Sequence, residues 1–291
     1  MKLAIVGSIN VDVYTQISKM PSLGETINGY NATKYFGGKG LNQAIACHKF
    51  GSDIKFIGAC GNDKYYDELL VYFNEMNFEN HNIIQKDIET GIANIFTTDD
   101  DNFIILNQGA NYKLTLNEII ESLDDEVEYI LIQNEINPTV TIDLINYCYK
   151  KGIKIIYNPA PVLGIESEVI EMIDYFIVNE VEFETIFNKS LEEELINQNG
   201  KLIVTLGANG VAFYDNGQIK KVDSFDVDVK DTTGAGDTFA GIFSANIAQG
   251  ENITKAVSYA NAGSSFVVQE VSAHKGMKSK EEIKKVINGK G

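Results

Sequence analysis

Short apolar runs rich in β-branched residues alternate with segments of helical periodicity over most of the chain. The clearest apolar runs cover residues 3–7, 54–59, 129–133, 153–157, 175–178 and 202–206. The amphipathic segments cover residues 40–50, 64–76, 138–150, 237–249 and 252–268. Strands that alternate with helices form a parallel sheet, because each crossover helix returns the chain to the same edge and packs on a face of the sheet. The sequence therefore predicts an α/β fold with a doubly wound, mainly parallel sheet flanked by helices.

Two segments interrupt this alternation, residues 12–36 and residues 91–106. Both have the period-two pattern of antiparallel strands, and the second contains an acidic turn at Asp99–Asn102. Ligands of an open α/β sheet bind beyond the carboxyl ends of its strands, so a small β-sheet at that place can act as a lid. Because no internal repeat or low-complexity linker is visible, we expect residues 1–291 to form one α/β domain that carries this lid.

The chain is strongly acidic and contains no arginine. Its 291 residues include 24 lysines against 41 aspartates and glutamates, which gives a formal charge of −17. Such a charge repels nucleic acid and anionic membranes, and no local basic run offsets it, so we expect neither as a partner. Without a guanidinium group, a phosphate can be held only by lysine, backbone N–H groups or a metal ion.

The cysteines and the apolar runs indicate a cytoplasmic protein. Cys47, Cys60 and Cys148 are too widely spaced for a disulfide framework or a metal-binding pair, so we expect them to be reduced. The first residues lead directly into an apolar strand and do not form a signal peptide. No apolar run reaches the roughly 18 residues that a membrane span needs.

The segment Asp231–Gly241 contains the sharpest chemical signal, the sequence Gly234-Ala-Gly-Asp237 directly before a helical segment. Small residues at a helix N-terminus leave unpaired N–H groups that attract an anion. Asp237 would lie beside this anion pocket, where a carboxylate can take a proton from an attacking hydroxyl group. The alternative is that Asp237 only caps the helix. The spacing of the glycines excludes both a P-loop and a dinucleotide-binding turn.

A second glycine-rich segment, Phe36–Gln43, also precedes a helical segment. Its glycines allow a ligand to approach the backbone, while Lys39 and Asn42 supply directional hydrogen bonds. Asn10 and Asp12 follow the first strand at alternate positions, so both side chains project to one side. A carboxylate with an amide suits a polyhydroxylated sugar. Alternatively, these segments are a glycine turn with a solvated lysine and an Asx turn.

Taken together, the two segments resemble the signature regions of the PfkB family of carbohydrate kinases, at 37–43 and 231–241. Five further stretches occur in the order seen in that family: Gly109–Asn111, Gln133–Glu135, Asn158–Pro161, Asn179–Glu182 and Thr205–Gly210. The resemblance thus covers nearly the whole chain. It implies transfer of the γ-phosphate of ATP to a sugar hydroxyl, with ribose as the expected acceptor and ribose 5-phosphate as the product.

The same resemblance implies a role for individual residues. Asp237 would be the catalytic base, and the N–H groups of Gly234, Ala235 and Gly236 would form the anion hole. The expected sugar contacts are Asn10, Asp12, Gly38, Lys39, Asn42, Glu135 and Asp237. The expected contacts to ATP are Asn179, Glu182, Thr205, Gly207, Gly210, Gly236 and Asn261. Asn179 and Glu182 carry the family's Asn-x-x-Glu motif, which places Mg²⁺ and phosphate.

Members of this family also bind an activating monovalent cation such as K⁺ near the anion hole. Here the site would use Asp231 and the carbonyl group of Thr233. The rest of the cation loop is expected from about 267–276, where Gln269–His274 departs from the family's basic Gly-Ala pattern. If the outer face of the lid is apolar, it would be exposed in a monomer, which favours a homodimer that forms through the lid.

Several alternatives remain open from the residues alone. Glu135 also fits a surface carboxylate, and Asn179 with Glu182 also fits a simple helix start. The acceptor could be deoxyribose, a nucleoside or another sugar. A phosphorylated sugar is less compatible, because Lys39 is the only cation in the predicted sugar pocket. A non-catalytic sugar-binding regulator would share the fold, but the intact Gly234–Asp237 segment favours a kinase.

Overall fold

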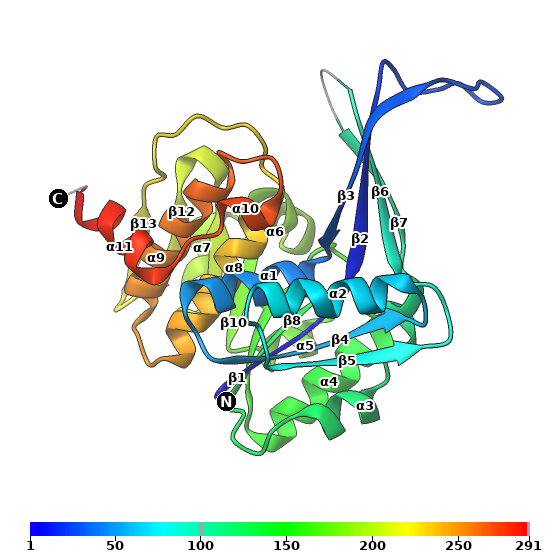
Figure 1. The fold of residues 1–291 in the computed structure, drawn as a ribbon. Coiled ribbons are helices and arrows are strands. Elements are labelled where there is room, and N and C mark those ends of the chain that lie inside the picture. Colours follow the sequence, from blue (N-terminus) through cyan, green and yellow to red (C-terminus); the bar gives the residue numbers. More distant parts are fainter. Residues whose placement is uncertain (99–101, 290–291) are drawn as a thin grey trace.

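A computed structural model of the protein describes residues 1–98 and 102–289 (Figure 1). Of the acidic turn predicted at Asp99–Asn102, residues 99–101 lie outside the described residues, and Asn102 is the first residue of a strand. Among the described residues, no helix combines the length and the apolar character needed to cross a lipid bilayer.

The main sheet has nine strands in the order β13-β12-β11-β10-β9-β8-β1-β4-β5. Neighbours from β11 to β5 pair in parallel, whereas β12 and β13 add an antiparallel hairpin at one edge. The bounds are β1 (Leu3–Val6), β4 (Ile54–Gly61), β5 (His81–Lys86), β8 (Tyr129–Gln133), β9 (Lys154–Asn158), β10 (Tyr175–Asn179), β11 (Leu202–Thr205), β12 (Val211–Asp215) and β13 (Gln218–Val222). The predicted doubly wound, mainly parallel sheet is confirmed.

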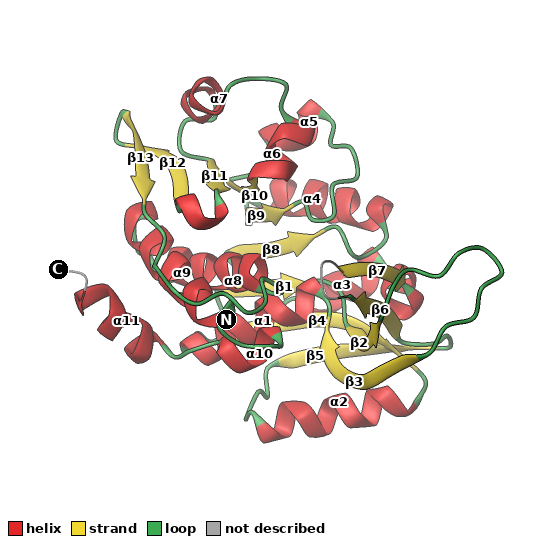
Figure 2. Ribbon diagram, turned by 90° about the horizontal axis from the view of Figure 1, so that it is seen from above, coloured by secondary structure: helices red, strands yellow, loops and turns green. Residues whose placement is uncertain are grey.

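Helices cover both faces of this sheet, as the view from above shows (Figure 2). One face packs against α1 (Lys39–Phe50), α2 (Lys64–Glu75), α8 (Ala235–Ala248), α9 (Ile253–Val267), α10 (Ala273–Gly276) and α11 (Lys280–Gly289). The other face packs against α3 (Leu116–Ser122), α4 (Pro138–Lys151), α5 (Ser167–Glu171), α6 (Glu180–Ile186) and α7 (Leu191–Asn197). Short 3₁₀ helices cover Gly109–Lys113 and Gly207–Asn209.

The strand β1 illustrates why the central strands are apolar throughout. Leu3 and Ile5 point into the core beneath α1 and α8, while Ala4 and Val6 point into the opposite core beneath α4. All four side chains are buried, because successive residues of a strand face opposite sides and both sides are covered by helices. The continuous apolar run is thus the signature of a strand at the centre of the fold.

A separate sheet of four strands projects from one end of the main sheet, in the order β3-β2-β6-β7 (Figure 1). Its strands are β2 (Asn10–Ile17), β3 (Gly29–Gly37), β6 (Gly91–Thr97) and β7 (Asn102–Asn107). They come from the two segments that the sequence marked as irregular. In the register of this sheet, Asp12 lies opposite Ala93 and Ile95 lies opposite Ile104, which places these side chains on one face.

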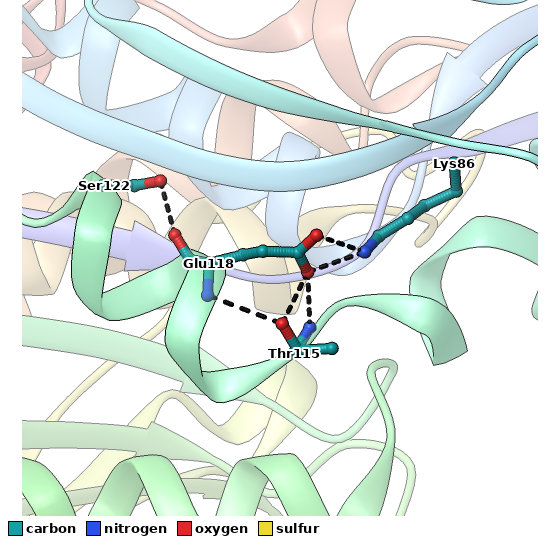
Figure 3. Close-up of polar contacts among 4 residues, drawn as sticks. All are labelled: Lys86, Thr115, Glu118 and Ser122. Atoms are coloured by element: carbon teal, nitrogen blue, oxygen red, sulfur yellow. Dashed lines mark hydrogen bonds and ion pairs between the residues drawn. The ribbon is translucent and has the colours of Figure 1, made fainter.

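An ion pair anchors the edge strand β5 to the helix α3 (Figure 3). The Lys86 ammonium donates to both carboxylate oxygens of Glu118, at 2.5 and 2.6 Å. Glu118 also forms a capping box with Thr115 at the start of α3, and its carbonyl oxygen accepts from the hydroxyl of Ser122. Burial raises the pKa of Glu118, but the contacts with Lys86 and Thr115 lower it by more. The pKa of Glu118 therefore lies below its usual value.

The helices α1 and α8 approach each other closely at Gly241. A Cβ atom added at Gly241 would lie 2.6 Å from the carbonyl oxygen of Gln43 and 2.9 Å from the Cβ atom of Ala46. The thiol of Cys47 donates to the carbonyl oxygen of Gly241 at 2.9 Å. This contact matters for function, because both helices begin at the glycine-rich segments singled out in the sequence.

Gly241→Ala is therefore predicted to destabilise the protein by about 1–3 kcal/mol, because the added methyl group must displace the backbone of α1. Gly236→Ala is the matched control for stability, since a Cβ atom at this position of the same helix meets nothing within 4 Å. Urea unfolding of the two variants measures the difference. Equal stability of both variants would contradict the close packing of α1 on α8.

Candidate active site

A cavity of about 350 Å³ lies at the carboxyl ends of the main strands, between them and the small sheet. The residues that follow β1, β8 and β10 meet there, as do the N-termini of α1 and α8. Its lining residues are Asn10, Asp12, Gly38, Lys39, Asn42, Ala93, Ile95, Ile104, Leu106, Glu135, Asn158, Ala160, Ile177, Val178, Asn179, Glu182, Thr205, Thr232, Thr233, Gly234, Gly236 and Asp237. This is the edge at which doubly wound sheets bind their ligands.

The structure brings most of the predicted site residues together in this cavity. All seven expected sugar contacts line it, from Asn10 to Asp237. Of the residues expected to contact ATP, Asn179, Glu182, Thr205 and Gly236 line the cavity, whereas Gly207, Gly210 and Asn261 do not. Thr233 lines it and Asp231 does not. The roles of the individual residues remain predictions.

The carboxylate of Asp237 is held by two side-chain amides from α1. Asn42 donates through Nδ2 to Oδ2 at 2.9 Å, and Gln43 donates through Nε2 to Oδ1 at 3.1 Å. Gln43 in turn accepts at Oε1 from the amide of Gln133, at 2.6 Å. Asp237 is 7% exposed, so its carboxylate is fixed in direction but still reaches the cavity. Each carboxylate oxygen has a further lone pair with which it can accept a substrate hydroxyl.

The N-terminus of α8 provides donors for an anion. Gly234 caps the helix with φ at 79°, a conformation that favours glycine, and the methyl group of Ala273 packs where a side chain would be. The N–H of Ala235 donates to the carbonyl of Thr232 at 3.2 Å, so one of the three predicted anion-hole donors is used within the turn. Gly236 lies in the first helical turn, where N–H groups have no helical partner, and the space beside its Cα atom is open. A phosphate oxygen can therefore approach Gly236.

The segment after β1 carries the side chains that face the small sheet. The side-chain oxygen of Asn10 accepts from the amide of Asn111 at 2.9 Å, and Asn111 also bonds both the N–H and the carbonyl of Ile9. Asn111 thus fixes the backbone directly after β1. The Gly109–Asn111 stretch therefore has a structural role. The carboxylate of Asp12 lies against Gly37, where an added Cβ atom would be 2.0 Å from Oδ2.

Lys39 is surrounded by carboxylates. Burial by itself lowers the pKa of Lys39, but Asp237, Glu135, Glu182 and Asp12 together raise it above its usual value. Lys39 is therefore charged at neutral pH.

The side chain of Glu135 is fixed next to Lys39 by two hydrogen bonds. Its Oε2 atom accepts from the Ser8 hydroxyl at 2.6 Å and from the backbone N–H of Lys39 at 3.0 Å. With 9% of its surface exposed, Glu135 is a buried residue of the cavity wall and not the surface carboxylate that the sequence left open.

Asn179 and Glu182 form a capping box at the start of α6. The Asn179 side chain accepts from the N–H of Glu182 at 2.8 Å, and Oε2 of Glu182 accepts from the N–H of Asn179 at 2.9 Å. Both also line the cavity, so the capping and ligand-binding interpretations are compatible. Among the described residues, no group of three or more acidic, histidine or cysteine side chains could hold a metal ion. A single carboxylate near phosphate oxygens suits Mg²⁺, which keeps several of its waters.

Gly210 and Asn261 shape the wall behind Thr205. A Cβ atom at Gly210, whose φ is 87°, would lie 2.0 Å from the carbonyl oxygen of Val222. The amide of Asn261 donates to the carbonyl of Asp223 at 2.9 Å. Both residues therefore hold the chain at the end of β13, and neither lines the cavity.

The segments predicted to form the monovalent-cation loop are adjacent. The N–H groups of Lys230 and Asp231 donate to the carbonyl of Val268 at 2.7 and 3.2 Å. The carboxylate of Asp231 accepts from the N–H of Thr233 at 2.8 Å. Ser272 has φ at 104°, a value unusual for a residue with a side chain.

Sequence reasoning missed two kinds of site residue. Gln43 was quoted only as part of a motif, and its contact with Asp237 joins residues 194 positions apart. The apolar side chains of Ala93, Ile95, Ile104 and Leu106 form the cavity wall on the small sheet. Their alternation in the strands was a visible signal, because alternate residues of a strand share a face.

Comparisons with known proteins agree with this geometry. A family model described as pfkB family carbohydrate kinase matches residues 1–280. The chain is 36% identical to a ribokinase of Lactococcus lactis subsp. lactis over 290 residues, which cover 97% of this chain and 96% of that relative. It is similar to the structure of ribokinase from Thermotoga maritima, with 28% identity, a TM-score of 0.87 and 99% of both chains covered. It is also similar to Arabidopsis thaliana ribokinase complexed with ribose and ATP, with 25% identity, a TM-score of 0.85 and 98% of both chains covered.

The raised pKa of Asp12 leads to a prediction of how the stability of the protein depends on pH. Burial, reinforced by Glu135 and Asp237, raises the pKa of Asp12 from 3.8 to about 7, although Lys39 opposes the change. Between these values the native protein keeps a proton that the unfolded chain has lost, so this group destabilises the fold increasingly as pH rises from 4 to 7. Asp12→Asn removes the penalty. We expect the Tm of the variant relative to the wild type to be highest above pH 7 and to decline towards pH 4, in thermal unfolding measured across this range. A difference in Tm that is independent of pH would contradict the assignment.

Proposed function

Because this chain belongs to the pfkB family of carbohydrate kinases, we propose that it transfers the γ-phosphoryl group of ATP to a hydroxyl of ribose and releases ribose 5-phosphate and ADP. The observation that carries the proposal is the position of Asp237. Its carboxylate is held by Asn42 and Gln43 and borders the cavity one residue after the open backbone at Gly236. The proposed base Asp237 thus lies next to a backbone segment at Gly236 that can bind phosphate.

The proton and phosphoryl steps follow from this placement. A carboxylate oxygen of Asp237 accepts the proton of the sugar hydroxyl as the hydroxyl oxygen bonds to the γ-phosphorus. The bond between the γ-phosphorus and the bridging oxygen breaks, and ADP leaves with that oxygen. Phosphoryl transfer depends mainly on alignment and charge stabilisation, so a weak base is sufficient. The helix dipole and the N–H of Gly236 stabilise the negative charge of the transferring group.

The sugar would bind between the main sheet and the small sheet. Asp12 and Glu135 can accept hydrogen bonds from its hydroxyls, while Lys39 and the amide of Asn10 can donate. Ala93, Ile95, Ile104 and Leu106 present an apolar surface from the opposite side. When the small sheet acts as a lid over the sugar, this surface excludes water and so prevents hydrolysis of ATP.

ATP and Mg²⁺ would occupy the part of the cavity near α6 and β11. Bound Mg²⁺ supplies positive charge that neutralises the phosphate oxygens. Glu182 and Asn179 would hold the metal's waters and the phosphates, and Thr205 would border the nucleotide. For a monovalent cation such as K⁺, we propose Asp231 and the carbonyl of Thr233 as ligands, next to the N-terminus of α8.

We further propose that the protein forms a homodimer through the small sheet. Ile105 on β7 is 59% exposed and points to the face opposite to that of Ile104, which lines the cavity. Apolar side chains on the strands of a projecting sheet are stabilised when a second copy covers them.

Asp237→Asn is predicted to lower kcat by about 10²- to 10⁴-fold, the contribution typical of a general base, while ribose still binds. The assay measures ADP release with ATP-Mg²⁺ and a panel of ribose, deoxyribose, other pentoses, hexoses and nucleosides, with and without K⁺. Ribose is expected to give the highest kcat/KM. Sugar binding by the variant is measured by calorimetry.

Asp228→Asn is the control, because it removes an exposed carboxylate from the loop before α8. It should retain the kcat of the wild type. Normal turnover by Asp237→Asn would show that another group is the base, whereas a folded wild-type protein that binds sugar without releasing ADP would identify a sugar-binding regulator. If the protein prefers another acceptor, the proposal that ribose is the acceptor is wrong, whereas the proposal that the protein is a kinase stands.

Ile105→Lys is predicted to shift the protein from dimer to monomer, because a charge on β7 cannot be buried against a second copy. Light scattering coupled to size-exclusion chromatography measures the mass. Val71→Lys is the control, since Val71 is 57% exposed on the helix α2 and belongs to no strand of the small sheet. A wild-type monomer, or a dimer unaffected by Ile105→Lys, would exclude this interface.

A further inference from the structure

The hydrogen bond from Asn42 to Asp237 belongs to a longer chain of contacts that leads away from the cavity. The Oδ1 atom of Asn42 lies 2.8 Å from Nε2 of His274 in α10. Nδ1 of His274 lies 2.8 Å from the hydroxyl of Tyr72 in α2, and the two rings stack with centroids 5.9 Å apart. The contacts join three helices to the carboxylate, across as many as 232 residues of sequence.

The chemistry of Asp237 fixes the direction of every hydrogen bond in this chain. An ionised carboxylate can only accept, so Asn42 must turn its NH₂ group towards Asp237 and its oxygen towards His274. His274 must then carry its proton on Nε2, and Nδ1 must accept from the hydroxyl of Tyr72. All donors therefore point towards the carboxylate, an arrangement in which each hydrogen bond strengthens the next.

The surroundings of His274 keep its ring neutral, as this pattern requires. The residue is 7% exposed, and burial together with the nearby Lys49 lowers the pKa of His274 to about 3. The ammonium of Lys49 donates to the carbonyl oxygen of His274 at 2.5 Å. A second cavity of about 410 Å³ borders the Tyr72 and His274 side chains, and its wall carries Lys34, Lys64, Lys275 and the carboxylate of Glu68.

We propose that His274 is a positioning residue of the kinase reaction: through its Nε2–H it holds the amide of Asn42 in the orientation that aligns and stabilises the Asp237 carboxylate. This inference rests on the proposed function, in which Asp237 is the base. Tyr72 serves the same purpose one step further out, because its hydroxyl fixes the tautomer of His274. His274 belongs to the segment Gln269–His274, which departs from the family's pattern. The proposal gives this segment a role in the hydrogen-bond network of Asp237.

The other histidines show that the arrangement is specific to His274. Nε2 of His48 lies 2.9 Å from the carbonyl of Met76, and its ring stacks on Phe78. His81 stacks on Phe73 in the core under α2. Neither contacts a residue of the cavity, so His81→Gln serves as a control for the loss of a partly buried histidine.

The test compares His274→Leu with His274→Gln. Leucine removes the donor, whereas the glutamine amide can still donate to Asn42. We expect His274→Leu to lower kcat by about 10- to 100-fold, the effect of one lost hydrogen bond to a charged network, with the KM for sugar nearly unchanged. His274→Gln should recover most of this loss, and His81→Gln should leave kcat at the wild-type level. Thermal unfolding verifies that each variant is folded.

The division of the effect between kcat and KM separates positioning from a purely structural role. The charged groups around Asp237 are Lys39 from α1, Asp12 from β2 and Glu135 after β8, and all remain in the variants. Because these groups are retained, the loss in His274→Leu should fall on kcat and not on the KM for sugar. Tyr72→Phe should lower kcat by less than His274→Leu, and His274→Gln should restore it.

Two NMR measurements test the inference without any enzymatic activity, so failure of the proposed function is distinguishable from failure of this proposal. The nitrogen shifts of His274 should show a neutral ring protonated at Nε2 from pH 5 to 8. The carboxyl carbon of Asp237, assigned by comparison with Asp237→Asn, should change its chemical shift at one fixed pH in Tyr72→Phe and His274→Leu relative to the wild type. A ring protonated at Nδ1, a His274 that titrates near pH 6.5, or an Asp237 carboxyl shift that none of these variants changes would overturn the proposal. If His274→Leu does not fold, Tyr72→Phe and the tautomer of His274 decide the question alone.

Discussion

The carboxylate of Asp237 is held by two amides from a helix that lies 195 residues away in sequence, and the geometry of the cavity depends on this contact. It requires that α1 and α8 begin at the same edge of the sheet and pack closely. Gly241 permits the approach, because any side chain there would overlap the backbone of Gln43. The two glycine-rich segments are thus parts of one structural unit, in which α8 carries Asp237 and the open backbone at Gly236 while α1 fixes the Asp237 carboxylate in direction.

Much of the fold and of the cavity lining could be predicted from the sequence because the relevant signals are local. A continuous apolar run indicates a strand covered on both faces, and a polar residue directly after such a run lies at the carboxyl edge of the sheet. Asn10, Glu135 and Asn179 follow three such strands, so their convergence needed no knowledge of long-range contacts. The apolar strands at the centre of the sheet were found for the same reason.

Other features could not be predicted because their causes are distant in sequence. The strands β5, β12 and β13 lie at or near the edges, where partial exposure weakens the apolar pattern. The sequence did not indicate the hydrogen bond from Asn261 to the carbonyl of Asp223, a partner that only the packing of α9 on the loop after β13 brings near, and the expected contact of Asn261 with ATP stays a prediction. His274 carried no recognisable motif, since its contact with Asn42 joins opposite ends of the chain. Family resemblance singled out Asn261 but not His274, and the hydrogen-bond partners of both residues follow only from the fold.

The distribution of charge in the cavity distinguishes its two halves. In the sugar half, Asp12, Glu135 and Asp237 surround the single ammonium of Lys39, so a second phosphate on the acceptor would meet carboxylates and no spare cation. In the proposed nucleotide half, the open backbone at Gly236 and the dipole of α8 offer partial positive charge, and no described lining residue adds a cationic side chain there. In the proposed reaction, a chain without arginine would therefore separate the two tasks: backbone and metal charge would serve the phosphates, and side-chain carboxylates would serve the hydroxyls. This separation favours a neutral, polyhydroxylated acceptor over a phosphorylated one.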